Sequence, residues 1–326
     1  FIGSQDNGLI QVNPKAPVKF FGDLNTVYCF AMNHEKRYVF HDKGLSILKG
    51  TKIIDEISLK KFKSVQVLKF KKFLKQATLN NHFYPIDYTT TEEKIIFYDA
   101  HIHKDKLWVS TNLGMYELNF DGFIKNYYPV HTFNFIFFKD LLVSAVPYGG
   151  VRIFSDIHNM KYRYEHDYEN DHIPSNVVSM AKIGNSVFFA SALTGLYRYE
   201  DGKFESLLKN NEFKEPKLKK ITVINKDNLL VVTDFNDVYE LNFEKDRVKI
   251  VSKTEYKDIK GSTTRGLDVI NGITYITTNL GVNVFKGEKS YFIDNEQGFN
   301  NYNAIKTFVH GDTLFIGSKK GYFTIN

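Results

Sequence analysis

The chain carries one β-hairpin signature eight times, and this repeat limits the fold more than any other feature of its 326 residues. In each copy a short apolar strand is followed by a polar turn and then by a second apolar strand. Most neighbouring turns lie 36 to 45 residues apart, which matches a four-stranded propeller blade of about 40–50 residues. Isolated hairpins are marginal in water, so these units must stack on one another. The turns close at Gly8, Gly44, Gly114, Gly150, Gly195, Asp237, Gly281 and Gly321.

One unit shows how four strands fit into each repeat. Its apolar stretches span residues 177–181, 187–191 and 196–199, and a more polar stretch follows at 204–207. The first is rich in small residues and suits a crowded axis, whereas the polar fourth suits a wet rim. The Asp201-Gly202 pair supplies the positive φ angles that a tight hairpin turn needs. We therefore predict an all-β chain that forms a single β-propeller of four-stranded blades.

The number of blades is left at seven or eight by these patterns. Eight hairpins argue for eight blades, one of them degenerate. The gap of 70 residues between Gly44 and Gly114 is wide enough to hide a blade, and residues 72–78 and 83–86 could form an eroded hairpin there. Residues 58–75 could instead be drawn as a basic amphipathic helix, but the β-branched and aromatic residues around them favour strands.

Composition limits the domain organisation. No Pro-, Gly- or Ser-rich linker interrupts the repeat, so residues 1–326 are expected to form one propeller domain. The chain opens within a hairpin and closes after a third strand, and we therefore expect a fragment of a longer protein. No apolar run reaches the ~18 residues that would span a membrane. Cys29, the sole cysteine, lies in an apolar stretch and is predicted to be a small core residue.

The net charge of +6 is modest and is carried mostly by lysine. Nucleic-acid-binding proteins concentrate Arg and Lys on one face, so no nucleic-acid partner is predicted. The one dense basic cluster reads as a solvated face; the alternative is an anion patch for uronic-acid or sulfated glycans, or a docking face. The cluster consists of Lys60, Lys61, Lys63, Lys69, Lys71, Lys72 and Lys75.

No sequence motif points to catalysis. The chain lacks a Gly-x-Ser-x-Gly nucleophile turn, a His-Glu-x-x-His motif and a phosphate-binding Gly-rich loop, so this chain is not predicted to be an enzyme. His101 and His103 are two residues apart on a predicted strand, with Asp99 on the same face. This spacing can hold a metal, but ordinary polar packing is the favoured reading, and we predict neither a metal nor a cofactor.

Candidate ligand-binding residues lie in the segments that lead into the inner strands, because these segments converge on one mouth of the central channel. They carry amides, hydroxyls and aromatic rings, which suit the hydroxyls and the flat faces of a sugar. Arg265 could pair with a uronate carboxylate. The alternative is that these residues cap turns and fill the channel. The predicted ligand-binding set is His131, Asn134, Asn176, Thr264, Arg265, Asn301 and Tyr302, and the same segments contain Phe133, Ser175 and Asn300.

The hairpin pattern resembles the two-component regulator propeller repeat. Residues 107–116 (LWVSTNLGMY) and 314–322 (LFIGSKKGY) match its hairpin best. Residues 173–180 (IPSNVVSM) and 298–305 (GFNNYNAI) look like the family's lead-in to the inner strand. The resemblance covers nearly the whole chain, but the second and sixth units and residues 51–95 depart from the pattern. The family pattern implies seven blades, with one stray hairpin that belongs to a neighbouring ring.

The resemblance implies a function. Members of this family form periplasmic sensor regions of membrane-bound histidine kinases or hybrid two-component proteins of Bacteroidetes, and they commonly sense oligosaccharides and act as dimers. The expected partners are therefore an oligosaccharide or other small ligand, a second copy of the chain and other domains of the same sensor. The alternating segment with Tyr162, Tyr164 and Tyr168 is a candidate dimer surface. Two alternatives remain: an interaction scaffold of the cell envelope, or a propeller lyase or glycosidase.

Overall fold

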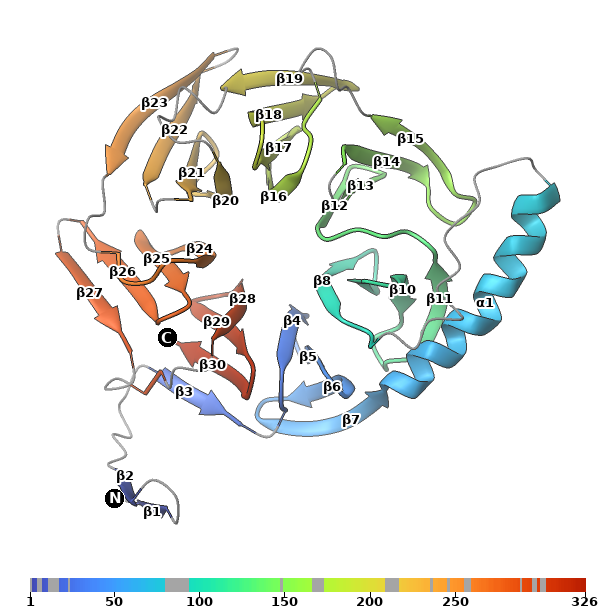
Figure 1. Ribbon diagram of the computed structural model, residues 1–326, viewed down its shortest axis with the longest axis horizontal. Helices are drawn as coiled ribbons and strands as arrows, with labels where there is room; N and C mark the ends of the chain where they lie inside the picture. The colour runs from blue at the N-terminus through green and yellow to red at the C-terminus, as the bar shows by residue number, and fades with distance from the viewer. Residues whose placement is uncertain are drawn as a thin grey trace.

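Seven antiparallel sheets of four strands stand around a central axis and form a β-propeller (Figure 1). This computed structural model describes residues 2–4, 8–10, 18–22, 24–79, 94–146, 149–165, 173–208, 217–234, 237–244, 247–254, 259–287, 289–294, 298–299 and 303–326. The first three blades consist of β4 (Val27–Met32), β5 (Arg37–His41), β6 (Gly44–Lys49) and β7 (Lys52–Ser58); β8 (Phe97–His103), β9 (Lys106–Thr111), β10 (Gly114–Leu118) and β11 (Ile124–Tyr128); and β12 (Phe135–Phe138), β13 (Leu141–Ala145), β14 (Val151–Asp156) and β15 (Lys161–Glu165).

The other four blades have the same arrangement; the innermost strand comes first in the chain in all of them except the last, whose outermost strand is β3. They consist of β16 (Val177–Ile183), β17 (Ser186–Ser191), β18 (Gly195–Glu200) and β19 (Lys203–Leu208); β20 (Leu218–Val223), β21 (Asn228–Thr233), β22 (Val238–Glu244) and β23 (Arg247–Thr254); β24 (Thr264–Ile270), β25 (Ile273–Thr278), β26 (Val282–Lys286) and β27 (Lys289–Ile293); and β28 (Ala304–His310), β29 (Thr313–Ser318), β30 (Gly321–Ile325) and β3 (Val18–Phe21).

The last blade closes the ring, because its outer strand comes from the other end of the chain. β3 pairs with β30 in antiparallel register from Val18 opposite Ile325 to Phe21 opposite Tyr322. The rings of Phe21 and Tyr322 stack with their centroids 4.6 Å apart. Gly321 has a φ of 131°, and a Cβ there would collide with the carbonyl oxygen of Phe21. The hairpin glycine thus serves two needs at once, the turn conformation and the close approach of the fourth strand.

Seven blades confirm the count that the family pattern implied, and the count of eight from the hairpins is wrong. The first hairpin, β1 (Ile2–Ser4) with β2 (Gly8–Ile10), forms a separate two-stranded sheet and lies outside the ring (Figure 1). Its local signature is the same as that of the other seven, but it has no partner strands among the described residues.

The wide gap in the repeat holds a helix rather than a hidden blade. α1 (Leu59–Leu79) contains residues 72–78, so the expected eroded hairpin is wrong there; residues 83–86 lie outside the described residues. Phe62, Gln66 and Phe70 are buried at intervals of four residues, which places them on one face of a helix. The Phe62 ring lies 5.3 Å from the ring of Phe97. This packing stabilises a helix despite the surrounding β-forming residues.

The core is divided into apolar clusters, several of which join neighbouring blades. The largest cluster joins the first two blades and α1, with Phe40, Val109 and Phe62 among its members. Cys29 is 1% exposed within it, as predicted, and burial raises the pKa of its thiol well above the usual value. Burial thus disfavours the thiolate, which is the reactive form of a cysteine. Among the described residues, no helix combines the length and the apolar character needed to cross a membrane.

We call the pairing of β3 with β30 the seam of the ring. If this pairing closes the ring, removing β3 should open it. Loss of residues 1–22 strips β30 of its partner strand, and we expect it to lower the free energy of unfolding by about 4 kcal/mol because the aromatic contacts and ladder bonds are lost. Urea denaturation measures the change. A chain lacking residues 1–10 is the matched control, and it should unfold at the same urea concentration as the full chain. Equal stability of the two truncated chains would contradict the seam.

The packing of α1 predicts different effects for two of its apolar residues. Phe62 is fully buried, so Phe62→Ala should destabilise the protein by about 3–5 kcal/mol, as for other buried Phe residues. Leu68 is 70% exposed on the same helix, and Leu68→Ala should change stability by less than about 0.5 kcal/mol. Thermal unfolding of both variants tests this contrast. A neutral effect of Phe62→Ala would mean that α1 does not dock on the blades.

Candidate functional site

A β-bulge recurs at the start of six of the seven inner strands. In β4, β8, β16, β20, β24 and β28 the first residue pairs with the second strand, the next residue is skipped, and pairing resumes one residue later. A bulge leaves the extra residue unpaired and re-aims the side chains beside it. Because the inner strands surround the axis, these positions gather at one mouth (Figure 1). The skipped residues are Tyr28, Tyr98, Val178, Lys219, Arg265 and Ile305, and the residues that follow are Cys29, Asp99, Ser179, Lys220, Gly266 and Lys306.

Asp99 is the hub of the polar contacts at this mouth. The Lys306 ammonium contacts its Oδ1, and the same ammonium donates to the carbonyl oxygen of Tyr98 at 2.9 Å. The His101 Nε2 lies 3.0 Å from the Asp99 Oδ2. β28 and β8 belong to the seventh and second blades, so the Lys306–Asp99 ion pair passes the first blade. Burial alone would raise the pKa of Asp99, but the charges and hydrogen bonds of Lys306 and His101 hold it well below its usual value.

Lys220 is the second charged group at the mouth, and its surroundings disfavour its charge. Burial and the nearby positive charge of Lys306 lower its pKa to about 8, although Asp99 and Asp268 act in the opposite direction. The neighbouring Lys219 is different, because its Nζ lies 2.7 Å from the Asp234 carboxylate. Lys220 has no ion-pair partner within 4 Å among the described residues. It is therefore a partly buried cation without a direct counter-charge.

Asp268 on β24 is the corresponding anion. Burial raises its pKa to about 6, although a hydrogen bond from Thr307 and the charge of Lys220 partly offset this rise. Its Oδ2 is buried and has no hydrogen-bond partner in the described part of the chain. Unpaired buried oxygens are costly and are rare in proteins. Asp268 and Lys220 thus interact electrostatically without forming an ion pair. The pKa values of both groups are shifted toward neutral pH, as is common at functional sites.

Three aromatic rings lie near the Asp99–Lys306 pair, whose ammonium bonds to the carbonyl oxygen of Tyr98. Tyr98 and Phe133 meet edge to face with their centroids 4.7 Å apart, and His131 stacks on Tyr98 at 6.2 Å. Tyr98 is the bulged residue of β8, and the other two belong to the segment that leads into β12. All three are partly exposed. They offer a flat apolar surface next to charged groups, which is the combination that a sugar face requires.

The structure places the predicted ligand-binding residues unequally. Arg265 is exposed at the bulge of β24, next to the buried Thr264. The Asn134 side chain donates to the carbonyl oxygen of Val178 at 3.2 Å and so joins the segment before β12 to the inner strand β16. Asn176 has a φ of 46° and its backbone bonds to Gly149 and Ala192, which makes it a turn residue.

The remaining members of the set divide in the same way. His131 belongs to the aromatic group, whereas Asn301 and Tyr302 lie outside the described residues. Their roles in ligand binding therefore stay predictions.

Sequence reasoning missed the charged residues of the inner strands. Lys220 and Lys306 occupy equivalent positions of two repeats, just after the bulge, where small or apolar residues were expected for the inner strand. A lysine at such a position was the sequence signal that could have pointed to the site. Asp99 and His101 were considered as metal ligands, but the His101 Nε2 lies within hydrogen-bond distance of the Asp99 carboxylate, and His103 stacks on Phe137 with ring centroids 4.0 Å apart. These contacts agree with the favoured reading of polar packing.

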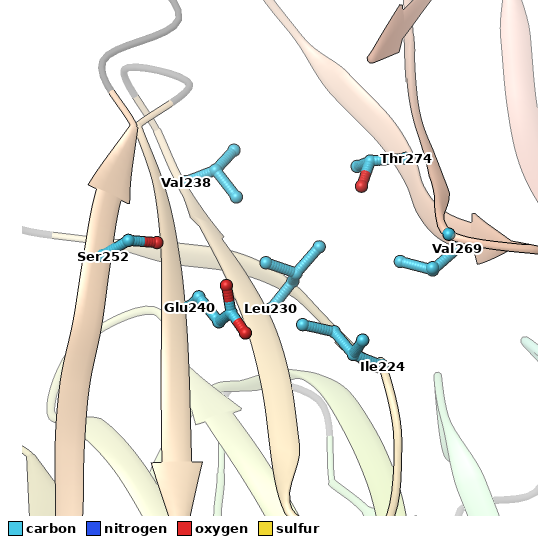
Figure 2. Close-up of a pocket in the computed structure, with 8 residues that line it drawn as sticks. Ile224, Leu230, Val238, Glu240, Ser252, Val269 and Thr274 are labelled. Atoms are coloured by element: carbon cyan, nitrogen blue, oxygen red, sulfur yellow. The ribbon is translucent and has the colours of Figure 1, made fainter. Parts of the chain in front are cut away.

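A hollow lies between the fifth and sixth blades, near the other ends of their inner strands (Figure 2). It holds about 210 Å³, and its walls are mixed: Leu230 and Val238 face Val269, and Glu240, Ser252 and Thr274 add polar groups. The Glu240 carboxylate accepts a hydrogen bond from Asn228 at 2.7 Å. Among the described members of the predicted ligand-binding set, none lines this hollow. Its single charged group already has a partner, so it offers less chemistry than the channel mouth.

Comparison with known proteins supports the fold. No family model matches the chain, and no curated protein matches it. The extracellular domain of the proposed one-component system BT4673 from B. thetaiotaomicron matches with a TM-score of 0.65 at 16% identity, and it covers 94% of this chain and 39% of that protein. The extracellular domain of the proposed hybrid two-component system BT3049 from the same organism matches with a TM-score of 0.64 at 13% identity, covering 95% and 41%.

A propeller enzyme is equally similar in shape. Virginiamycin B lyase from Staphylococcus aureus has a TM-score of 0.67 at 11% identity, and the match covers 94% of this chain and 97% of the lyase. Identities this low show the fold alone. The chain spans about two fifths of the two Bacteroides domains and nearly the whole length of the lyase.

The pKa values of Asp99 and Asp268 are shifted in opposite directions, so an Asp→Asn substitution should have opposite effects on stability at the two positions. The pKa of Asp268 is raised from 3.8 to about 6, so its charge destabilises the fold at pH 7, and Asp268→Asn should stabilise the protein by about 1–3 kcal/mol. The pKa of Asp99 is lowered, so its charge stabilises the fold above pH ~4, and Asp99→Asn should cost about 2–4 kcal/mol because Lys306 loses its partner.

Urea denaturation at pH 7 and at pH 4.5 measures both effects. Near pH 4.5 Asp268 is largely protonated in the folded protein, and the gain from Asp268→Asn should shrink. Asp99 stays ionised there, so the loss from Asp99→Asn should persist. Destabilisation by both variants at pH 7 would contradict the assigned environments.

Proposed function

We propose that this chain is a non-enzymatic, ligand-sensing β-propeller of a two-component signalling protein. The observation that carries the proposal is the channel mouth, where the inner ends of different blades supply partly exposed aromatic rings, cations and an unpaired carboxylate oxygen. The fold neighbours from B. thetaiotaomicron are extracellular domains of proposed signalling systems, and this supports the same role. In this proposal residues 1–326 form one domain of a longer periplasmic sensor.

The proposed ligand is an oligosaccharide. The rings of Tyr98 and Phe133 would stack on a sugar face, while His131 and Arg265 would bind its polar groups. Such a ligand would contact the second, third and sixth blades together. Groups on different blades move relative to each other more easily than groups within one sheet, so ligand binding would favour one arrangement of the ring.

Signal transfer then requires that the favoured arrangement also alters a contact outside the ring. We propose that this contact involves a second copy of the chain or another domain of the same sensor, and that it passes the change to a kinase module. The candidate dimer surface on β15 remains a prediction; Tyr162 packs on Phe154 at 5.0 Å there, and Tyr168 lies outside the described residues.

An interaction scaffold of the cell envelope is the second candidate. It is favoured by α1, which presents exposed Lys60, Lys61, Lys71 and Lys72 beside Leu68 and has no acidic residue. A catalytic role is less well supported, because the likeness to the lyase concerns the fold alone.

A thermal-shift panel of neutral and acidic oligosaccharides tests the sensor proposal. A ligand present at 100 times its Kd should add about 2.7 kcal/mol of stability and raise the unfolding temperature accordingly. Phe133→Ala should remove this shift, because the sugar loses a stacking ring. Tyr291→Ala, which removes a 54% exposed ring from the rim, is the matched control and should keep it.

The outcome separates the two candidates. Stabilisation by no oligosaccharide, together with capture of a stable protein partner that depends on the lysines of α1, would favour the scaffold. A shift that survives Phe133→Ala would move the ligand away from the channel mouth.

A further inference from the structure

We infer that the channel mouth binds a sugar acid, with its carboxylate held by Lys220 and Arg265 and a neighbouring hydroxyl given to Asp268. This assignment rests on the proposed function of the mouth as a ligand site, and it adds the chemical class of the ligand. It follows from which charged side chains at the mouth already have an ion-pair partner and which do not.

Two of the four cations at the bulges are already paired. Lys306 contacts Asp99, and Lys219 lies 2.7 Å from Asp234. Lys220 and Arg265 have no ion-pair partner among the described residues. The two lie on the neighbouring strands β20 and β24, and the positive charge of Arg265 contributes to the lowered pKa of Lys220. Two unpaired cations on adjacent strands form a ready site for an anion.

The charge balance favours a single negative charge. Lys219, Lys220, Arg265 and Lys306 face three carboxylates, those of Asp99, Asp234 and Asp268, which leaves one positive charge in excess. A monovalent carboxylate would neutralise that excess. A partly buried ammonium without a counter-charge is unfavourable in the empty protein, and this penalty is relieved when an anion binds.

Asp268 specifies the second polar group of the ligand. Its buried Oδ2 lacks a hydrogen-bond donor among the described residues, and no ion pair with Lys220 forms within 4 Å. A hydrogen-bond donor from the ligand would satisfy this oxygen. An ammonium would face repulsion from Lys220, Arg265 and Lys306, so a hydroxyl is the better donor. A carboxylate next to a hydroxyl on the same sugar ring describes a uronate.

The experiment compares acids with their neutral counterparts by isothermal titration calorimetry. The probes are trigalacturonate, triguluronate and a glucuronate-containing disaccharide, each beside its methyl ester, which keeps the sugar rings and hydroxyls but carries no charge. At least one acid should bind more than tenfold more tightly than its ester. Its affinity should fall above pH 8, where Lys220 loses its proton, although Lys306, Arg265, Asp99 and Asp268 shift the exact midpoint.

Variants of Lys220 separate charge from structure. Lys220→Met and Arg265→Gln should each weaken acid binding at least tenfold and leave ester binding unchanged, whereas Lys220→Arg should retain it. Lys61→Met on α1 removes an exposed charge far from the inner strands in sequence and fold, and it is the matched control. Thermal unfolding of Lys220→Met shows that the variant is folded before it is titrated.

The results distinguish the sugar-acid assignment from the sensor proposal on which it rests. Equal binding of acids and esters, or binding only of neutral or sulfated oligosaccharides, would overturn the sugar-acid assignment and leave the sensor proposal standing. Tight binding of amino acids in place of sugars would also overturn it. If no oligosaccharide of any kind binds, both the assignment and the sensor proposal fail.

Discussion

The antiparallel pairing of β3 with β30 is the constraint on which the rest of the structure depends. It joins the two ends of the chain within one blade and turns a row of sheets into a closed ring. Only in a closed ring do bulges at the same position of different repeats face a common axis. The Lys306–Asp99 ion pair shows this directly, because it joins the seventh blade to the second past the blade that follows the seam.

The charged residues at the mouth differ in what they do for the fold. Asp99, Lys306 and His101 satisfy one another, and this network ties inner strands together. Lys220 and Asp268 are held in surroundings that disfavour their charges. Groups that weaken a fold are retained when they serve a purpose that the folded protein alone does not reveal. The contrast within one small region is the main reason to place function at the mouth rather than in the hollow between the fifth and sixth blades.

The ring could be predicted from the sequence because each hairpin has a local signature, a glycine at the turn between runs of apolar residues. The first hairpin shows the limit of such signals, since Gly8 closes the same local pattern outside the ring. A helix over residues 58–75 was considered but strands were favoured, because the packing of Phe62, Gln66 and Phe70 that decides for α1 is visible only in the folded chain. The site was only partly foreseen. Arg265 is exposed at the bulge of β24, and its role in binding stays a prediction, whereas the surroundings of Asp268 and Lys306 are set by residues of other blades.

The repeated bulge also separates the evolution of specificity from the evolution of the scaffold. Each of the six bulged inner strands places one extra residue at this position, and the hydrogen-bonded ladder resumes behind it whether that residue is Tyr28 or Lys219. At an exposed member such as Arg265, a point mutation changes the chemistry of the mouth, whereas the neighbouring Cys29 and Gly266 are packed against adjacent blades. A family built on such a ring can therefore diversify its ligands by small steps, one blade at a time.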